Sequence, residues 1–403
     1  MEFVSAIDLG SKERMGKSGQ LSLFVFVDAL GLEIVERHDF FGEHSKTRCS
    51  LSTVFGYSST CDPTILTGKL PREHGHFTFY RYDPENSPFG WYRWLGLFPK
   101  WLTNRGRVRA RLSRLLKRVH GFTGYFQLYN MPFDRLHLFD YTEKKNIFEK
   151  GGINGGQPTI FDYLREHRIP HFRSESYSER KTIDSLLRAI ETGEIVFAYL
   201  FLGSLDAVLH AHGTTSPRVP EKLEWYEAEL SRILECAHSN YDEVRMFVFS
   251  DHGMTDVRKT CDLIERVDSL GLQFGEDYAA VYDSTMARFW FLRDGSRETI
   301  VDALEKEKDG RIVPMSDLHE WGCDFPNDVY GELFFLMNPG VLICPSFMGE
   351  RALAGMHGYD PLHRDSAAAF MSTVDVSPVP RRLDEIYALM LDEAKGASAA
   401  RRG

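Results

Sequence analysis

The chain has 403 residues and a formal net charge of −10, a size that suits one large α/β domain with insertions. The negative charge disfavours a general nucleic-acid-binding protein, and no apolar run is as long as a transmembrane helix. The first 20 residues lack the continuous apolar segment of a signal peptide, and the six cysteines form no CxxC pair, so we expect a cytoplasmic protein.

Apolar, β-rich runs alternate with helical patterns along the chain. Buried strands are predicted at 21–27, 195–202 and 244–250, and helices at 158–167, 183–191 and 220–237. Strands that alternate with helices predict an α/β fold, in which a mostly parallel central sheet is covered by helices on both faces. In such folds the active site lies at the carboxyl ends of the strands.

Two segments interrupt the alternation of strands and helices. Residues 76–152 are aromatic and basic, whereas 256–350 carry strands and a helix of their own, at 288–292, 332–337 and 297–307. The predicted units are a catalytic core of 1–75, 153–255 and 351–395, a cap insertion at 76–152, a small α+β insertion at 256–350 and a disordered tail at 396–403. The last helix is expected over 380–394, before that tail.

Ionisable side chains follow the predicted strands. Asp28 ends the first apolar run, and Asp251 and His252 follow the third. A carboxylate at the end of a buried strand is costly unless it is paired or bound to a metal, although a helix N-cap or a tight turn is the structural alternative. Asp206 and His210 are four residues apart, so on a helix they share one face and can reach one ion or form a surface pair.

A serine and a late histidine complete the set of candidate residues. Ser58 precedes the segment 63–68, which predicts a helix start with Pro63 in the first turn, and N–H groups there would face a phosphate. Helix capping is the alternative role for Ser58. His357 lies in the glycine-containing loop AGMHGYD. The combined set suits two zinc-like ions and consists of Asp28, Ser58, Asp206, His210, Asp251, His252 and His357.

The motifs S-D-H-G-M, H-G-Y-D and L-T-G-x-x-P-x-x-H-G, in this order and spacing with the D-x-x-x-H of Asp206 and His210, resemble the type I phosphodiesterase/nucleotide pyrophosphatase family of the alkaline phosphatase superfamily. The resemblance covers roughly 20–75, 155–255 and 350–395 and implies an alkaline-phosphatase-like core. In that family the nucleophile lies nine residues before the Thr of T-G, which is Ser58 here. Ser58 replaces the usual Thr, and Cys61 stands where the family has an Asn that helps to hold phosphate.

The resemblance implies a ligand set for each of two divalent ions, zinc in preference to manganese. One ion would be held by Asp206, His210 and His357, and the other by Asp28, Ser58, Asp251 and His252. It also implies hydrolysis of a phosphodiester or phosphoanhydride, of nucleotide type, through a phosphoryl-serine intermediate, with Ser59 and Cys61 as substrate-binding candidates. A phosphomonoesterase or phosphotransferase of the same superfamily is the first alternative, and a non-catalytic binding protein on this scaffold is the second.

Residues 86–132 contain no acidic residue in a chain that is acidic overall. Tryptophans at 91, 94 and 101 precede a basic run of Arg105, Arg107, Arg109, Arg111, Arg114, Lys117 and Arg118. Apolar residues recur in this run at helical spacing, which predicts a basic amphipathic helix. Three interpretations stay open: a cap packed on the core with its arginines paired to acidic groups, a surface for anionic lipid or a polyanionic substrate that would make the protein peripheral to a membrane, and, least favoured, a site for nucleic acid.

Overall fold

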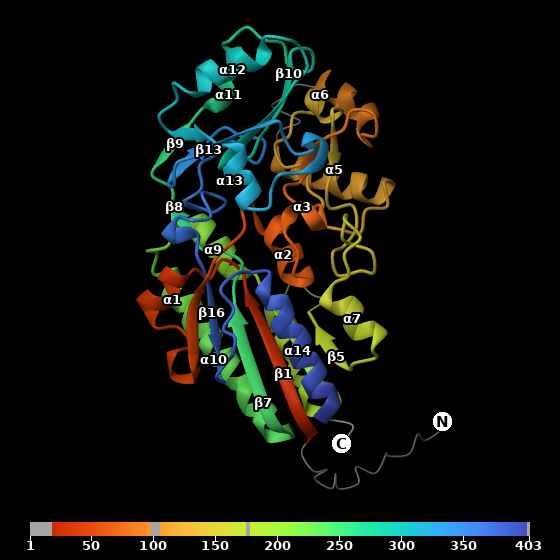
Figure 1. Cartoon of the computed structure of the whole chain (residues 1–403), viewed down its shortest axis with the longest axis vertical. Coiled ribbons are helices and arrows are strands. Elements are labelled where there is room, and N and C mark those ends of the chain that lie inside the picture. The colour runs from red at the N-terminus through yellow and green to blue at the C-terminus, as the bar shows by residue number, and fades with distance from the viewer. Residues whose placement is uncertain (1–17, 98–104, 175–177, 401–403) are drawn as a thin grey trace, which may run out of the picture.

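The computed structural model describes residues 18–97, 105–174 and 178–400 (Figure 1). The strands of its main sheet are β1 (Ser18–Val27), β2 (Thr47–Leu51), β5 (His171–Arg173), β6 (Phe197–Leu202), β7 (Tyr241–Phe249) and β16 (Ala368–Ser372). They form a six-stranded sheet in the order β2-β16-β7-β1-β6-β5. Strands β5, β6, β1 and β7 are parallel to one another, and β16 runs antiparallel to its neighbours β7 and β2. The expectation of a mostly parallel central sheet is therefore confirmed.

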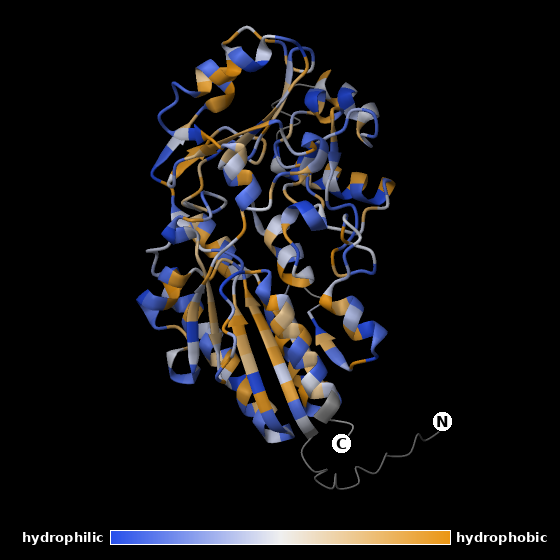
Figure 2. Cartoon of the chain, viewed as in Figure 1, coloured by the Kyte–Doolittle hydropathy of each residue, from blue (hydrophilic) through white to orange (hydrophobic). Residues whose placement is uncertain are grey.

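Helices cover both faces of the main sheet. One layer contains α1 (Leu32–His38), α8 (Glu179–Glu191), α9 (Ser204–His212) and α10 (Arg218–Asn240), and the other contains α2 (Ser58–Thr67), α7 (Ile160–Glu166) and α14 (Glu385–Ala400). Side chains of β1 alternate between the two layers: Leu23 and Val25 join the first core cluster, and Phe24 and Phe26 join the second. Both faces of the strand are thus apolar, which explains its unbroken hydrophobic run and the orange strands of Figure 2.

A second lobe lies beyond the carboxyl edge of the main sheet, at the top of Figure 1. Its centre is an antiparallel sheet of β10 (Tyr278–Tyr282), β11 (Met286–Phe291), β13 (Leu333–Met337) and β12 (Gly310–Ile312), with α11 (Leu263–Asp268), α12 (Ser296–Leu304) and α13 (Met315–Glu320). Short pairs join β9 (Lys259–Cys261) to β14 (Val341–Ile343) and β8 (Thr255–Asp256) to β15 (Gly355–Met356). The segment 76–152 adds β3 (Tyr80–Tyr82), η2 (Gly90–Leu97), α5 (Gly106–Val119), α6 (Phe133–Leu136) and β4 (Phe139–Tyr141), after α3 (Pro71–His74).

The two inserted segments share one hydrophobic core. The ring of Trp290 on β11 lies 5.4 Å from that of Tyr82 and 5.8 Å from that of Phe139, both from the cap segment. Tyr80 and Tyr141 belong to the same buried cluster. The sequence suggested two separate insertions because it shows only neighbours along the chain, whereas the contacts that join them are long-range.

Arg288 ties the two inserted segments together from within this core. Its side chain is fully buried, and Nε lies 3.0 Å from Oδ2 of Asp283. Nη1 donates to the carbonyl oxygens of Tyr80 and Tyr330, at 3.0 and 2.8 Å. Burial raises the pKa of Asp283, and the guanidinium opposes this rise.

We expect Arg288→Met to reduce the free energy of unfolding by about 3–5 kcal/mol, because Asp283 would stay buried without its partner. Urea denaturation measures this loss. Replacing both residues, with Arg288→Met and Asp283→Leu, should recover part of it. Arg382→Met removes a surface pair with Asp384 and should cost less than about 1 kcal/mol. Equal losses for the buried and the surface arginine would contradict the prediction.

The end of the chain differs from the expectation. Helix α14 continues to Ala400, so the disorder predicted for 396–403 is wrong over 396–400, and 401–403 lie outside the described residues. Ala394 and Ala397 are buried in the core cluster of the second layer. Small side chains in a polar tail resemble a disordered segment, but alanine is the best helix former and lets this last turn pack closely.

Candidate active site

The predicted site residues gather at the carboxyl edge of the main sheet. Asp28 directly follows β1, Asp206 lies in the first turn of α9 after β6, and Asp251 lies two residues after the end of β7. His357 precedes β16, and because β16 is antiparallel its entry point lies at the same edge. Ser58 begins α2, which follows β2. Strand β2 runs in the same direction as β7, because both are antiparallel to β16, which lies between them. One edge therefore collects side chains from five segments.

Helix α2 begins five residues earlier than the sequence indicated. Pro63 was placed in the first turn because proline is tolerated best there, but it lies inside a helix that starts at Ser58. Tyr57 is the N-cap, and its carbonyl oxygen accepts from the N–H groups of Thr60 and Cys61, at 2.7 and 3.0 Å. Ser58 now supplies one of the first N–H groups of the helix, which have no carbonyl partner within it.

The first group of potential ligands contains Asp28, Asp251 and His252, whose ligand atoms all lie within 4.8 Å of one another. Nε2 of His252 is 3.0 Å from Oδ2 of Asp251 and 3.8 Å from Oδ1 of Asp28. Oγ of Ser58 lies 3.1 Å from the same nitrogen. The hydroxyl therefore faces the centre of this group.

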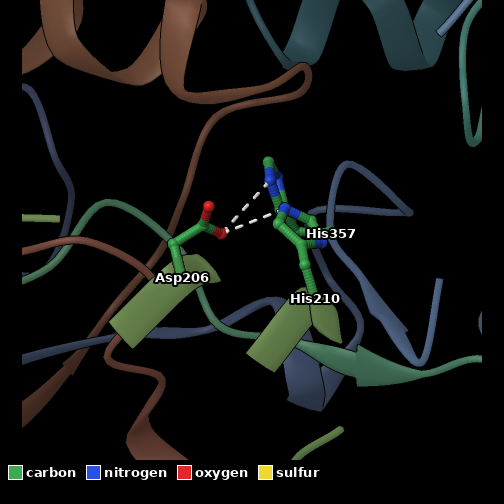
Figure 3. A group of neighbouring side chains, drawn as sticks. All are labelled: Asp206, His210 and His357. Atoms are coloured by element: carbon green, nitrogen blue, oxygen red, sulfur yellow. Dashed lines mark ion pairs between the residues drawn. The ribbon is translucent and has the colours of Figure 1, made fainter. Parts of the chain in front are cut away.

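The second group contains Asp206, His210 and His357 and meets the same 4.8 Å criterion (Figure 3). Oδ1 of Asp206 lies 3.1 Å from Nε2 of His210 and 3.8 Å from Nε2 of His357, as the dashed lines show. The His252 and His357 rings stack with their centroids 3.7 Å apart, so the two groups adjoin each other.

The hydrogen bonds of the histidines fix which nitrogen can bind a cation. Nδ1 of His210 lies 2.8 Å from the carbonyl oxygen of Gly355, and Nδ1 of His252 lies 2.9 Å from that of Gly253. A carbonyl can only accept, so each Nδ1 carries a hydrogen and the neutral ring presents the Nε2 lone pair to the carboxylates. Lone pairs on both sides require a cation between them.

Three carboxylate oxygens also indicate that a cation binds here. Oδ1 of Asp28, Oδ1 of Asp206 and Oδ2 of Asp251 are buried and accept no hydrogen bond within the described residues. Buried carboxylates are rarely left unpaired, because desolvation of the charge is expensive. The residues present therefore fit divalent cations with mixed nitrogen and oxygen ligands.

Without a metal, protons would take the place of these cations. Burial, followed by Asp251 and Asp206, raises the pKa of Asp28 well above its ordinary value. Burial lowers the pKa of His252, but Asp251 outweighs it and brings the value to about 9. Burial and the two neighbouring histidines lower the pKa of His357, which keeps that ring neutral and able to act as a ligand.

Comparisons with known proteins identify the family of the chain. The sequence profile described as type I phosphodiesterase / nucleotide pyrophosphatase matches residues 43–360, most of the chain. The chain belongs to this family. The predicted resemblance is thereby confirmed.

Among curated proteins, human ectonucleotide pyrophosphatase/phosphodiesterase family member 7 is 23% identical over 261 residues, covering 62% of this chain and 50% of the relative. The rat protein of the same name is 23% identical over 235 residues, covering 55% of this chain and 46% of the relative. The chain thus spans about half the length of the curated relatives that it matches.

Solved structures extend the likeness to the fold. Murine ectonucleotide pyrophosphatase/phosphodiesterase 5, an inactive variant in complex with AMP, superimposes with a TM-score of 0.66 at 14% identity, covering 93% of this chain and 95% of that chain. The human counterpart gives the same TM-score, identity and coverage. The alkaline-phosphatase-like fold expected from the sequence is therefore confirmed.

The two substrate-binding candidates have protein partners. Oγ of Ser59 donates to the carbonyl oxygen of Phe77 at 2.8 Å. Cys61 is buried, with Sγ 3.6 Å from Oγ1 of Thr53, and burial followed by Asp251 raises the pKa of its thiol. Their contact with substrate stays a prediction.

Sequence reasoning missed two carboxyl groups near Ser58, the candidate nucleophile. Asp62 lies one helical turn after Ser58, and burial, Asp251 and then Glu143 raise its pKa. Glu143 from the cap segment is buried, which raises its pKa to about 8. The i,i+4 spacing of Ser58 and Asp62 was the available signal, but the misplaced helix start hid it. No motif or spacing in the sequence around Glu143 indicated that this residue lies near the site.

A third group of potential ligands lies in the second lobe and consists of Cys261, Glu307 and Asp309. Its carboxylates already have cationic partners. Arg266 pairs with Glu307 and Lys259 with Asp309, each at 2.6 Å. This group therefore lacks the uncompensated charge that distinguishes the other two.

Proposed function

We propose that this chain is a metal-dependent hydrolase that cleaves a phosphodiester or phosphoanhydride with Ser58 as the nucleophile. The position of Ser58 carries the proposal. Its hydroxyl stands at the first turn of α2, 3.1 Å from His252 Nε2, beside two groups of carboxylates and imidazoles that fit divalent cations. Family membership supports hydrolysis of phosphodiesters as the reaction class.

Two divalent ions fit this arrangement, one in each group of ligands. Asp28, Asp251, His252 and Ser58 would hold one, and Asp206, His210 and His357 the other. Zinc suits a mixed set of imidazole and carboxylate ligands, with manganese as the alternative. When bound, such ions favour the alkoxide form of serine and neutralise the charge of the phosphate.

The side chains of the site then perform two displacements. Oγ of Ser58 attacks phosphorus and forms an O–P bond while the bond to the leaving alcohol or phosphate breaks. Free N–H groups at the start of α2 face the phosphate oxygens, where the helix dipole also favours negative charge. Water next attacks the phosphoryl-serine, releases the phosphate product and restores the hydroxyl. Two in-line steps give net retention at phosphorus.

A nucleotide-type substrate is the first choice. The family description names nucleotide pyrophosphatases, and the murine relative was solved with AMP. The cap segment adjoins the site, since Ser59 donates to its Phe77, so we propose that this segment sets substrate choice. We keep the cytoplasm as the proposed location.

Purified protein should hydrolyse bis-p-nitrophenyl phosphate and a nucleotide sugar faster than p-nitrophenyl phosphate, since the proposed substrates carry a second group on phosphorus. Release of nitrophenol and of nucleoside monophosphate measures the rates. A preference for the monoester would favour a phosphomonoesterase or phosphotransferase. Tight nucleotide binding without turnover, with both metals present, would favour a binding protein.

A further inference from the structure

Helix α5 of the cap turns a basic face away from the core. Its buried side is formed by Arg109, Ser113 and Leu116. Arg109 donates to the carbonyl oxygen of Met131 at 2.6 Å and lies 4.5 Å from the ring centre of Phe133, so this arginine is part of the core. The opposite side carries a row at i, i+4, i+7 and i+11, namely Arg107, Arg111, Arg114 and Arg118, all exposed.

This arginine row forms no ion pair with any described residue, although most arginines elsewhere in the described chain have a carboxylate partner. Nε of Arg114 donates to the carbonyl oxygen of Ala110, a bond within the helix. The cause is compositional, because residues 86–132 contain no acid. A cap whose arginines simply pair with acidic surface groups would not leave all four unpaired.

Large apolar side chains are exposed beside the arginine row. Trp91, Trp94 and Leu97 of η2 are 85%, 56% and 77% exposed, and Leu115 and Val119 of α5 are 55% and 62% exposed. Soluble proteins rarely gather so many exposed apolar side chains on one short stretch unless a partner covers them.

The two elements that carry these side chains are held together. Oη of Tyr92 in η2 lies 3.0 Å from Nε2 of His120, which caps α5, and Phe89 packs edge-on against the same imidazole. The η2 turn therefore adjoins the end of α5 that bears Leu115 and Val119. Helix α5 lies at the periphery of the second lobe in Figure 1. Trp101, which the sequence added to this set, lies outside the described residues.

We propose that this cap surface, defined as the four arginines with Trp91, Trp94, Leu97, Leu115 and Val119, docks on an anionic phospholipid bilayer. Basic side chains meet anionic head groups, and indoles are favoured at the boundary between head groups and acyl chains. Burial of leucine and valine side chains is favourable only in an apolar phase. A bilayer offers such a phase, and a nucleic acid does not. No helix among the described residues has the length and apolarity to cross a bilayer.

Vesicle flotation tests this surface directly. Full-length protein is mixed at about 0.1 M salt with vesicles of phosphatidylcholine, or of phosphatidylcholine with about 30% phosphatidylglycerol. We expect flotation with the anionic vesicles only, weakened by added salt. Combined Arg→Gln changes at Arg107, Arg111, Arg114 and Arg118 should weaken binding at least about tenfold. The double change of Trp91→Ala and Trp94→Ala should also weaken vesicle binding, although it leaves the net charge of the protein unchanged.

A control variant removes the same charge from the helical layer of the main sheet. It changes the exposed residues Lys181, Arg188, Arg218 and Arg232 to Gln and should float like the unmodified protein. Circular dichroism melts of all variants report whether the fold is kept. Absence of flotation, flotation indifferent to lipid charge, or equal loss in the control would overturn the proposal. Binding of a single-stranded oligonucleotide through the same arginines, without vesicle binding, would overturn it in favour of nucleic acid.

Discussion

Ser58→Ala should lower the turnover of bis-p-nitrophenyl phosphate by at least about a thousandfold, because the variant lacks the proposed nucleophile. The side chain is only partly buried and its hydroxyl bonds to His252 alone among the described residues, so the fold should tolerate the change. Steady-state rates measure the loss, and a thermal melt within a few degrees of the parent shows that folding is intact.

Neighbouring hydroxyls supply the matched controls. Ser59→Ala removes a donor to the carbonyl oxygen of Phe77 and a predicted substrate contact but leaves the proposed nucleophile, so it should lose far less activity than Ser58→Ala. Thr60→Ser preserves a hydroxyl that bonds to the same carbonyl and should also remain active. If Ser58→Ala is active and the variant at Ser59 or Thr60 is not, the nucleophile lies elsewhere in this first turn.

Removal of metal by a chelator should abolish turnover and lower the melting temperature, with both restored by zinc. The parent should contain about two divalent ions per chain by elemental analysis. His357→Ala, which opens the second group of ligands, should retain about one. Glu307→Gln alters the group in the second lobe and should leave the content unchanged. A parent without metal that neither zinc nor manganese reactivates would refute the proposed metal site.

The stabilisation by zinc should depend on pH. In the metal-free protein the pKa of His252 is raised to about 9 and that of Asp28 is also raised. A group whose pKa is higher in the folded than in the unfolded protein stabilises the fold at pH values below the unfolded pKa, which is about 6.5 for histidine. This stabilisation is lost as the pH rises through the folded pKa. Metal-free protein should therefore melt at lower temperature at pH 9 than at pH 6.5. Zinc replaces those protons, so its effect on melting should be larger at pH 9.

The sequence placed the candidate ligands at the strand ends correctly because their setting is local. Asp28 and Asp251 each follow an unbroken apolar run, and parallel strands bring their carboxyl ends to one edge. His357 had no such signal and was found through its motif. The start of α2 was misplaced because the tertiary packing of that helix overrides the usual position of proline. Glu143 approaches the site through long-range contacts that no local pattern records.

The short pair of β8 and β15 has a consequence for how this protein can be altered. Met356 pairs with Thr255, so the chain leaves the core just after His252 and returns just before His357 at a single point. The segment between them can thus be exchanged only together with the cap segment 76–152, because the two share one buried core that Arg288 joins through the carbonyl oxygen of Tyr80. A further contact would have to survive the exchange: Thr285 donates to the carbonyl oxygen of Gly358 at 2.7 Å, and its N–H bonds to Oη of Tyr57. Chimeras that exchange both segments and keep this contact offer a route to new substrate preferences with the candidate ligands in place.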